Sequence, residues 1–326
     1  MVKFQFSTSP HVRATSSTKI IMINVCIALL PATIMGIVFF GVLAALNIIV
    51  AVASAILSEI VYCLCIKQKF KDIISDFDYT SVVTGIIIAL IIPANAHLYI
   101  PALASIFAIV VVKMLFGGTG YNIVNPAAAG RIFAFTSFAS IMNNFVNPSI
   151  GTIGENLLVS GATSLQNFLT NGTTLSSIDL FLGTGVAGCI GETCKVAILI
   201  GALYLAIRGI IKIWLPILSI LITGAMTVLL NGFDLNVFLP AILSGGLIFS
   251  TFFMATDYVT SPTSTLGNVI YFIGFGFLTA LFRQFTGFET VSFAILMMNV
   301  LVPLIDKLTV VLYRPFGYVK KNKGGK

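Results

Sequence analysis

A glycine-rich stretch that runs into a predicted helix is the first place where this sequence could do chemistry. Residues 117–127 read Gly-Gly-Thr-Gly-Tyr-Asn-Ile-Val-Asn-Pro-Ala, which predicts Asn125 as the N-cap and Pro126 in the first turn. Free backbone N–H groups at such a start favour anions or a polar cofactor edge, although a well-capped tight turn explains the pattern equally well. Arg131 follows inside an apolar run, where a guanidinium is expected to pair with a phosphate, a flavin edge or a carboxylate.

A second candidate is the hydroxyl of Thr163, which lies in a polar stretch among small residues. Its neighbours are Ser160, Gly161, Ala162 and Ser164. They leave room for a bulky group to reach the hydroxyl, but no general base accompanies it, so a nucleophilic enzyme is not indicated. From the residues alone, an ordinary turn is favoured over a modification site.

Three carboxylates lie within or at the edge of apolar runs, where ionisable side chains often serve ion or proton movement. They are Glu59, Glu192 and Asp257. For Glu192 and Asp257 we favour a cation or proton site, or a group facing a cofactor, over a solvated carboxylate at the membrane interface. For Glu59 the two interpretations are even. The five cysteines and two histidines show no metal-binding spacing, so no metal site and no catalytic residue is predicted.

The elements that hold these residues are expected to be membrane-spanning helices. Hydrophobic residues make up 58% of the 326 residues and charged residues 9%, against about 25% charged in soluble domains. The apolar runs do not alternate as barrel strands do. At roughly 20 residues per crossing, about ten spans are expected. They lie near 20–40, 42–66, 79–93, 98–116, 125–142, 192–210, 213–231, 236–256, 266–285 and 289–312. The short ones at 79–93 and 125–142 are expected to be half-helices.

Lysine and arginine gather in the two tails and in alternate connections between these spans. The positive-inside rule then predicts that both termini are cytoplasmic, and that the polar connection 143–190 with Thr163 lies outside the cell membrane. The net charge of +7 comes from these connections and not from a patch of basic and aromatic residues. Nucleic-acid binding is therefore not predicted.

A weak internal repeat divides the chain. Gly85 to Pro101 and Gly246 to Pro262 have equal spacing, and each pair brackets an apolar run. Five spans per repeat would make the two halves inverted, and in such folds the site lies between the halves where broken helices meet. We therefore expect one membrane domain made of a first repeat, an external loop and a second repeat with the cytoplasmic tail, at 1–142, 143–190 and 191–326.

Six short motifs in order give the chain a family resemblance that runs nearly end to end. They are Ser-Pro-His at 9–11, the glycine-rich motif at 117–127, Ser-Gly-Ala-Thr at 160–163, Gly-Glu-Thr at 191–193, Phe-Phe-Met-Ala-Thr-Asp at 252–257 and Pro-Leu-Ile-Asp at 303–306. Together they resemble the RnfD/NqrB family. RnfD belongs to the Rnf electron-transport complex, and NqrB belongs to the sodium-pumping NADH:quinone reductase.

The resemblance implies two flavins. In the family, the threonine of the Ser/Thr-Gly-Ala-Thr motif carries FMN joined through its phosphate, which here is Thr163 and would make the chain a phosphorylated flavoprotein. Many relatives have proline after that threonine, whereas this chain has Ser164. A second, noncovalent flavin, riboflavin, is also implied, with Asn125, Arg131 and Asp257 as candidate contacts. The implied fold is similar to that of ammonium and urea channels.

The implied function is that of a membrane subunit of an ion-translocating ferredoxin:NAD oxidoreductase, a translocase that couples electron relay to Na+ or H+ movement. Expected partners are Rnf subunits A, B, C, E and G, with ferredoxin and NAD acting through the complex. The chain has no NAD-binding glycine fingerprint and no cysteine set for an iron–sulfur cluster, so it is not expected to be an enzyme alone. The alternative is a channel or secondary transporter for a small solute without a redox role.

Overall fold

The computed structural model is mostly helical in the part of the chain that it describes, which confirms an all-α fold at that level. Two strands of two residues each accompany the helices, β1 (Phe145–Val146) and β2 (Ser160–Gly161). Side chains of residues 160, 161, 177 and 310–312 are not described. The described residues are 17–75, 77–148, 160–161, 177–183, 185–286 and 290–312.

The first helix, α1 (Thr18–Cys65), contains two arms. Ser17 caps its start, and Gly41 interrupts it with φ 66° and ψ −146°, a conformation essentially restricted to glycine. At 1.5 Å per residue, 48 helical residues would extend about 70 Å, more than twice the thickness of a bilayer core. The break at Gly41 therefore separates two helical arms, which match the predicted ranges 20–40 and 42–66.

The rest of the first half consists of shorter elements. They are α2 (Phe70–Ser75), α3 (Thr80–Leu90), α4 (Tyr99–Ile106), the π-helix η1 (Phe107–Met114), α5 (Pro126–Ser137) and α6 (Ala139–Met142). Asn125 is the N-cap of α5, with its Oδ1 accepting from the backbone N–H of Ala127 and Ala128, and Pro126 opens the helix. The predicted cap is thus confirmed.

The second half contains a helix broken at glycines. Its elements are α8 (Ser177–Leu182), α9 (Lys195–Ile207), α10 (Trp214–Leu230), the 3-10 helix η2 (Leu235–Val237), α11 (Phe238–Leu243), α12 (Leu247–Phe253), α13 (Thr265–Thr286) and α14 (Val291–Leu312). The segments on either side of Ser244–Gly246 are bent by 56°. The sequence predicted one span at 236–256, whereas the structure shows two short helices there.

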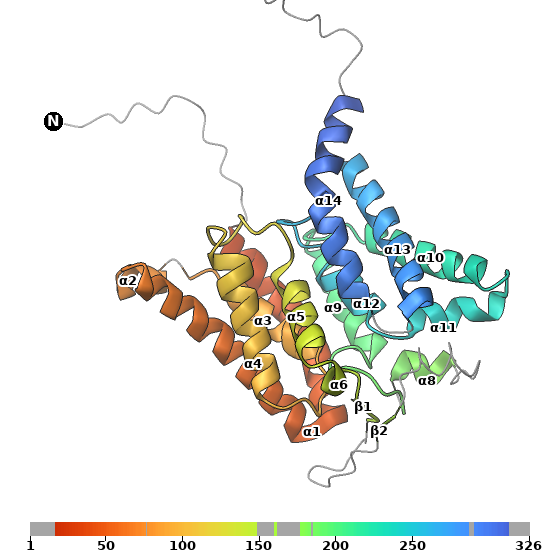
Figure 1. Ribbon diagram of the computed structural model, residues 1–326, viewed down its shortest axis with the longest axis horizontal. Coiled ribbons are helices and arrows are strands. Elements are labelled where there is room, and N and C mark those ends of the chain that lie inside the picture. Colours follow the sequence, from red (N-terminus) through yellow and green to blue (C-terminus); the bar gives the residue numbers. More distant parts are fainter. Residues whose placement is uncertain are drawn as a thin grey trace, which may run out of the picture.

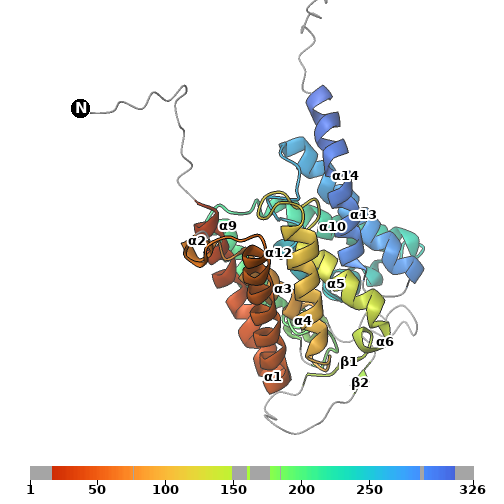
Figure 2. The same cartoon turned by 60° about the vertical axis from the view of Figure 1, so that its left-hand side comes forward.

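The two halves lie side by side (Figure 1), with α1 to α6 on one side and α9 to α14 on the other. They meet where α1 packs on α9 and where α5 packs on α14. The start of α1 and the end of α14 lie toward one end of the molecule, and the strands and α6 lie toward the opposite end, as Figure 2 also shows. Below, these are called the terminal end and the strand end. In Figure 1, α8 also lies toward the end with the strands.

Many large apolar side chains are exposed on the helix surfaces. Large apolar side chains such as Ile34, Val42 and Ile49 are 57%, 56% and 63% exposed. Among the described residues, α1, α13 and α14 are each long and apolar enough to cross a membrane, and the bent α11–α12 pair is a fourth candidate. A helix occupies each of the ten predicted ranges. The chain is therefore a membrane protein, while the count of ten crossings and the inverted repeat stay predictions.

Candidate functional site

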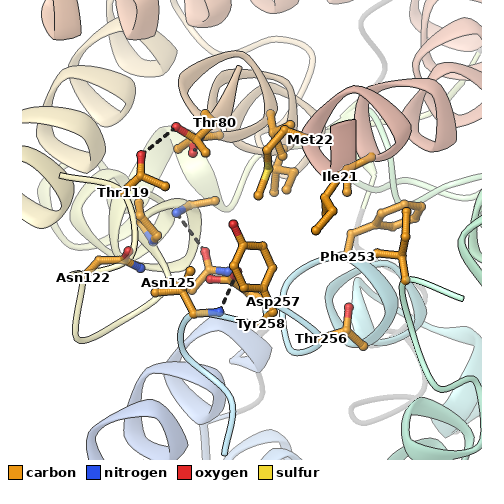
Figure 3. A pocket seen from close by; sticks show the side chains of 18 of the residues that line it. Ile21, Met22, Thr80, Thr119, Asn122, Asn125, Phe253, Thr256, Asp257 and Tyr258 are labelled. Atoms are coloured by element: carbon orange, nitrogen blue, oxygen red, sulfur yellow. Dashed lines mark hydrogen bonds between the residues drawn. The ribbon is translucent and has the colours of Figure 1, made fainter. Parts of the chain in front are cut away.

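A pocket opens between the two halves toward the terminal end (Figure 3). Its apolar walls come from the start of α1, from α3, from the end of α9 and from α12, with Met22, Phe252 and Phe253 among them. Its empty volume is ≈ 850 Å³, part of which is open to solvent. Apolar walls with a few polar groups are typical of small-molecule and cofactor sites.

The glycine-rich loop forms one polar wall of this pocket. Gly117, Gly118 and Gly120 have φ values of 115°, 91° and 93°, a left-handed region that side-chain-bearing residues rarely adopt. The loop places Thr119 and Asn122 against the pocket (Figure 3). Hydroxyl and amide groups in such a wall can bind the polar edge of a ring system.

Asn125, a predicted cofactor contact, lines the pocket and also joins the two halves. Its Oδ1 lies 2.9 Å from the N of Ala127 and 3.2 Å from the N of Ala128 at the start of α5. Its Nδ2 donates to the carbonyl oxygen of Met254, 3.1 Å away at the end of α12. Both ends of the amide are thus engaged by backbone groups, which gives Asn125 a structural role at the pocket floor.

A cluster of charges with a buried lysine at its centre stands at the α3 side of the pocket. Lys113 of η1 is 2% exposed, and its Nζ lies 2.8 Å from Glu59 Oε1 and 4.0 Å from Asp78 Oδ1. Lys113 also donates to the hydroxyls of Thr80 and Ser81. Glu59, for which the sequence left an ion-path role and a solvated carboxylate even, is paired with a lysine.

The turn before α3 ties the cluster to the glycine-rich loop. Thr80 and Thr119 each donate a hydroxyl hydrogen bond of 2.5 Å to Asp78. Partial burial raises the pKa of Asp78, but the ammonium of Lys113 and the two hydroxyls outweigh burial and hold the pKa below its usual value. Lys113, Asp78 and Thr119 were not predicted as site residues from the sequence. A lysine within the apolar run 98–116 was the available signal, and it was interpreted as a marker of topology.

Asp257 forms part of the opposite wall, next to Thr256 and Tyr258 (Figure 3). It accepts hydrogen bonds from the N of Val259 at 3.3 Å and from Thr260 Oγ1 at 3.2 Å. Burial raises the pKa of its carboxyl above the usual value, opposed by these two hydrogen bonds. Asp257, which follows α12, is therefore an acid that faces the pocket and is easier to protonate than an ordinary aspartate.

Arg131 and Glu192 form a buried ion pair deeper between the halves. Nη1 of Arg131 lies 2.7 Å from Glu192 Oε1, and both side chains are at most 6% exposed. The Glu192 carboxylate packs directly on Gly246 at the break before α12, where a Cβ would overlap it. The sequence predicted a phosphate, a flavin edge or a carboxylate as the partner of Arg131. Among the described residues, Arg131 pairs with the carboxylate of Glu192.

The Ser-Gly-Ala-Thr motif at 160–163 begins at the strand end. Ser160 and Gly161 form β2, which pairs antiparallel with β1, and Val146 of β1 also bridges to Gly188. Ala162, Thr163 and Ser164 lie outside the described residues. The predicted residues thus fall into separate places: Asn125 and Asp257 at the pocket, Glu59 behind its wall, Arg131 with Glu192 between the halves, and the motif strand at the opposite end.

Comparisons with known proteins match nearly the whole chain. The model of the NQR2, RnfD, RnfE family matches residues 5–313. The chain is 39% identical to the D subunit of the Na(+)-translocating ferredoxin:NAD(+) oxidoreductase complex of Acetobacterium woodii, over 98% of this chain and 97% of the relative. It is 33% identical to the D subunit of the proton-translocating ferredoxin:NAD(+) oxidoreductase complex of Clostridium ljungdahlii, over 94% of each chain. The D subunit of an ion-translocating oxidoreductase complex from Stutzerimonas stutzeri is 35% identical, over 95% of this chain and 94% of the relative.

Proposed function

Because this chain belongs to the NQR2, RnfD, RnfE family, we propose that it is the RnfD component of a membrane complex that couples electron transfer between ferredoxin and NAD to ion movement. The observation that carries the proposal is the 39% identity to such a component across 98% of the chain. We propose that it is one subunit of a translocase and does not catalyse the complete reaction alone. Its expected neighbours are Rnf subunits A, B, C, E and G, through which ferredoxin and NAD would act.

The proposed electron carrier at the strand end is FMN, esterified through its phosphate to the hydroxyl of Thr163. The support is the Ser-Gly-Ala-Thr motif, together with the position of its first two residues in β2 at the end opposite the start of α1. Small residues around a threonine hydroxyl suit attachment of a bulky group. The electron relay would then begin or end on this side of the membrane.

The proposed site of the noncovalent flavin, riboflavin, is the pocket at the terminal end. Apolar walls such as Phe252 and Phe253 suit the faces of a ring system, and Thr119 and Asn122 suit its polar edge. A bound flavin would supply one- and two-electron redox chemistry. The chain's own residues would hold the ring, exclude water from it and fix the charge around it.

The proposed ion coupling uses groups between the two halves, with Asp257 at the pocket and Glu192 deeper in. Both are carboxylates at broken helices, the position at which many transporters bind ions. Of the two relatives named above for a particular ion, one is named for Na+ and one for protons. Electron transfer by everted vesicles, measured with and without sodium, distinguishes Na+ from H+ as the coupling ion.

Covalent flavin is the property that tests the proposal. The protein is produced in cells that contain the flavin-attaching enzyme, denatured, run on a gel and illuminated. Thr163→Val should abolish a fluorescent band that the wild type shows, while Thr173→Val, which removes a hydroxyl from the same polar connection, should keep it. A fluorescent Thr163→Val band rejects the site, and a wild-type band without flavin rejects the flavoprotein function.

A channel or secondary transporter without a redox role is the second candidate. The observation in its favour is the pair of half-helices α11 and α12, which break at glycines between the halves. Such an arrangement serves solute transport as well as redox-driven transport. Absence of flavin from the wild-type protein, combined with solute flux in proteoliposomes, would favour this alternative.

A further inference from the structure

We infer that the charge cluster of Glu59, Asp78 and Lys113 sets the reduction potential of the redox ligand in the terminal-end pocket, with Lys113 as the charge nearest to that ligand. The inference rests on the proposed function, because it takes a noncovalent flavin as the ligand of that pocket. The structure describes the side chains of Glu59, Asp78 and Lys113.

The geometry around Lys113 is that of a fixed charge. An ammonium has three donors, and here they meet Glu59 Oε1 at 2.8 Å, Ser81 Oγ at 3.3 Å and the hydroxyl of Thr80. With all three donors engaged and 2% exposure, the side chain has no freedom to turn toward water. Its charge is therefore held at one place in the pocket wall.

The surrounding elements explain why the lysine faces inward. The i→i+5 register of the π-helix η1 places Lys113 against α3, and such local departures from α-helix are frequent at functional sites. Asp78 accepts from Thr80 on α3 and from Thr119 on the glycine-rich loop. The cluster thus joins α1, η1, the start of α3 and the loop that carries Asn122.

The distance of each charge from the pocket decides how strongly it changes the reduction potential of the ligand. Lys113 lines the pocket, whereas Glu59 and Asp78 lie behind it and are not among the lining residues. Charges interact more strongly at short range and in a low-dielectric site. An electron added to the ligand is therefore stabilised by the near ammonium and opposed by the two carboxylates behind it.

This arrangement predicts opposite signs for neighbouring substitutions, measured by redox titration of the noncovalent flavin in the purified complex. Lys113→Gln removes the near positive charge and should lower the midpoint potential. Glu59→Gln removes a negative charge and should raise it. The Lys113→Gln/Glu59→Gln double variant keeps the net charge and should return toward wild type. For Lys113→Gln we expect a change of about tenfold in relative affinity for the reduced ligand, which is about 59 mV for a one-electron couple.

A purely structural role would give a different pattern, since loss of any member would loosen the pocket and lower flavin content without opposite shifts. Lys69→Gln, at an exposed lysine between α1 and α2, is the matched control and should leave the potential unchanged because solvent screens its charge. Shifts of equal sign in Lys113→Gln and Glu59→Gln, or no shift with flavin retained, would overturn the inference.

Flavin content separates this inference from the proposed function. The amount of extracted noncovalent flavin is measured for each variant. A wild-type complex without noncovalent flavin would contradict the proposed pocket ligand, and not the role of the charges. Asp78→Asn provides an independent arm if Lys113→Gln does not assemble, because it leaves the lysine–glutamate pair in place. It should raise the midpoint potential, and an unchanged or lowered value would contradict the electrostatic role.

Discussion

At the scale of single residues, the molecule depends on charges that are buried in pairs. Arg131 and Glu192 are both nearly inaccessible, and the nearly inaccessible Lys113 pairs with the partly buried Glu59. Taking one charge out of water is costly, and a close opposite charge offsets much of that cost. The two pairs therefore restrict which substitutions the interior tolerates, apart from any role in transport.

Neutralising one member of the deeper pair should be far worse than neutralising both. We expect Arg131→Gln to lose about 3–5 kcal/mol, because Glu192 is left buried without its 2.7 Å partner. Arg131→Gln/Glu192→Gln should recover much of this loss, since two amides remain. Thermal unfolding of the detergent-solubilised protein is the measurement. The exposed Arg208 gives the control Arg208→Gln, and a double variant as unstable as the single would contradict the pairing.

At the scale of elements, close helix approach depends on a few glycines. In α9, a Cβ at Gly201 would overlap the carbonyl oxygen of Ala28 in α1 and lie 3.0 Å from Phe253 Cζ. In α13, a Cβ at Gly274 would instead meet the flexible end of Met298, 2.7 Å from Cε and 2.9 Å from Sδ. The same added methyl group therefore meets a rigid neighbour in one helix and a movable one in the other.

The contrast between these glycines gives a matched test of the contact between the two halves. Gly201→Ala should destabilise the protein by about 1–3 kcal/mol, because the backbone of α1 must move away. Gly274→Ala should cost clearly less, since a methionine side chain can adopt another rotamer. Melting temperatures of both variants in the same detergent measure the difference. Equal losses would mean that α9 and α1 do not pack as closely as the structure has them.

At the scale of the whole molecule, the two functional regions lie at opposite ends. The pocket and the start of α1 are at the terminal end, and β1, β2 and α8 are at the strand end. The buried Arg131–Glu192 pair lies between them along α5 and α12, since each helix touches the pocket at one end and the pair farther along.

The charge distribution predicts which end faces the cytoplasm. In a cysteine-free background, Asn171→Cys should react with a membrane-impermeant maleimide added outside intact cells, because the connection 143–190 is expected outside. Lys321→Cys in the basic C-terminal tail should react only after the membrane is opened. Labelling of both positions from the same side would contradict the odd number of spans predicted between them and the charge-based orientation.

Local properties of the sequence determined the helices and their ends. The apolar runs predicted where helices lie, and Asn125-Pro126 predicted the start of α5, because capping and hydrophobic periodicity act within a few residues of the chain. The ordered motifs, which need no coordinates, also pointed to the family. The bend at Ser244–Gly246 was not predicted. An apolar run that contains glycines is also compatible with a continuous helix, so the sequence indicated one span there.

Only the tertiary structure decided which distant groups meet. Lys113 and Glu59 are 54 residues apart, Arg131 and Glu192 are 61 apart, and Asn125 and Met254 are 129 apart. No local pattern encodes these partners, because each pairing depends on how whole helices pack and on where each half-helix ends. For the same reason Glu59, Glu192 and Asp257 looked alike in the sequence, yet they occupy three different environments: a lysine pair, an arginine pair and a pocket wall.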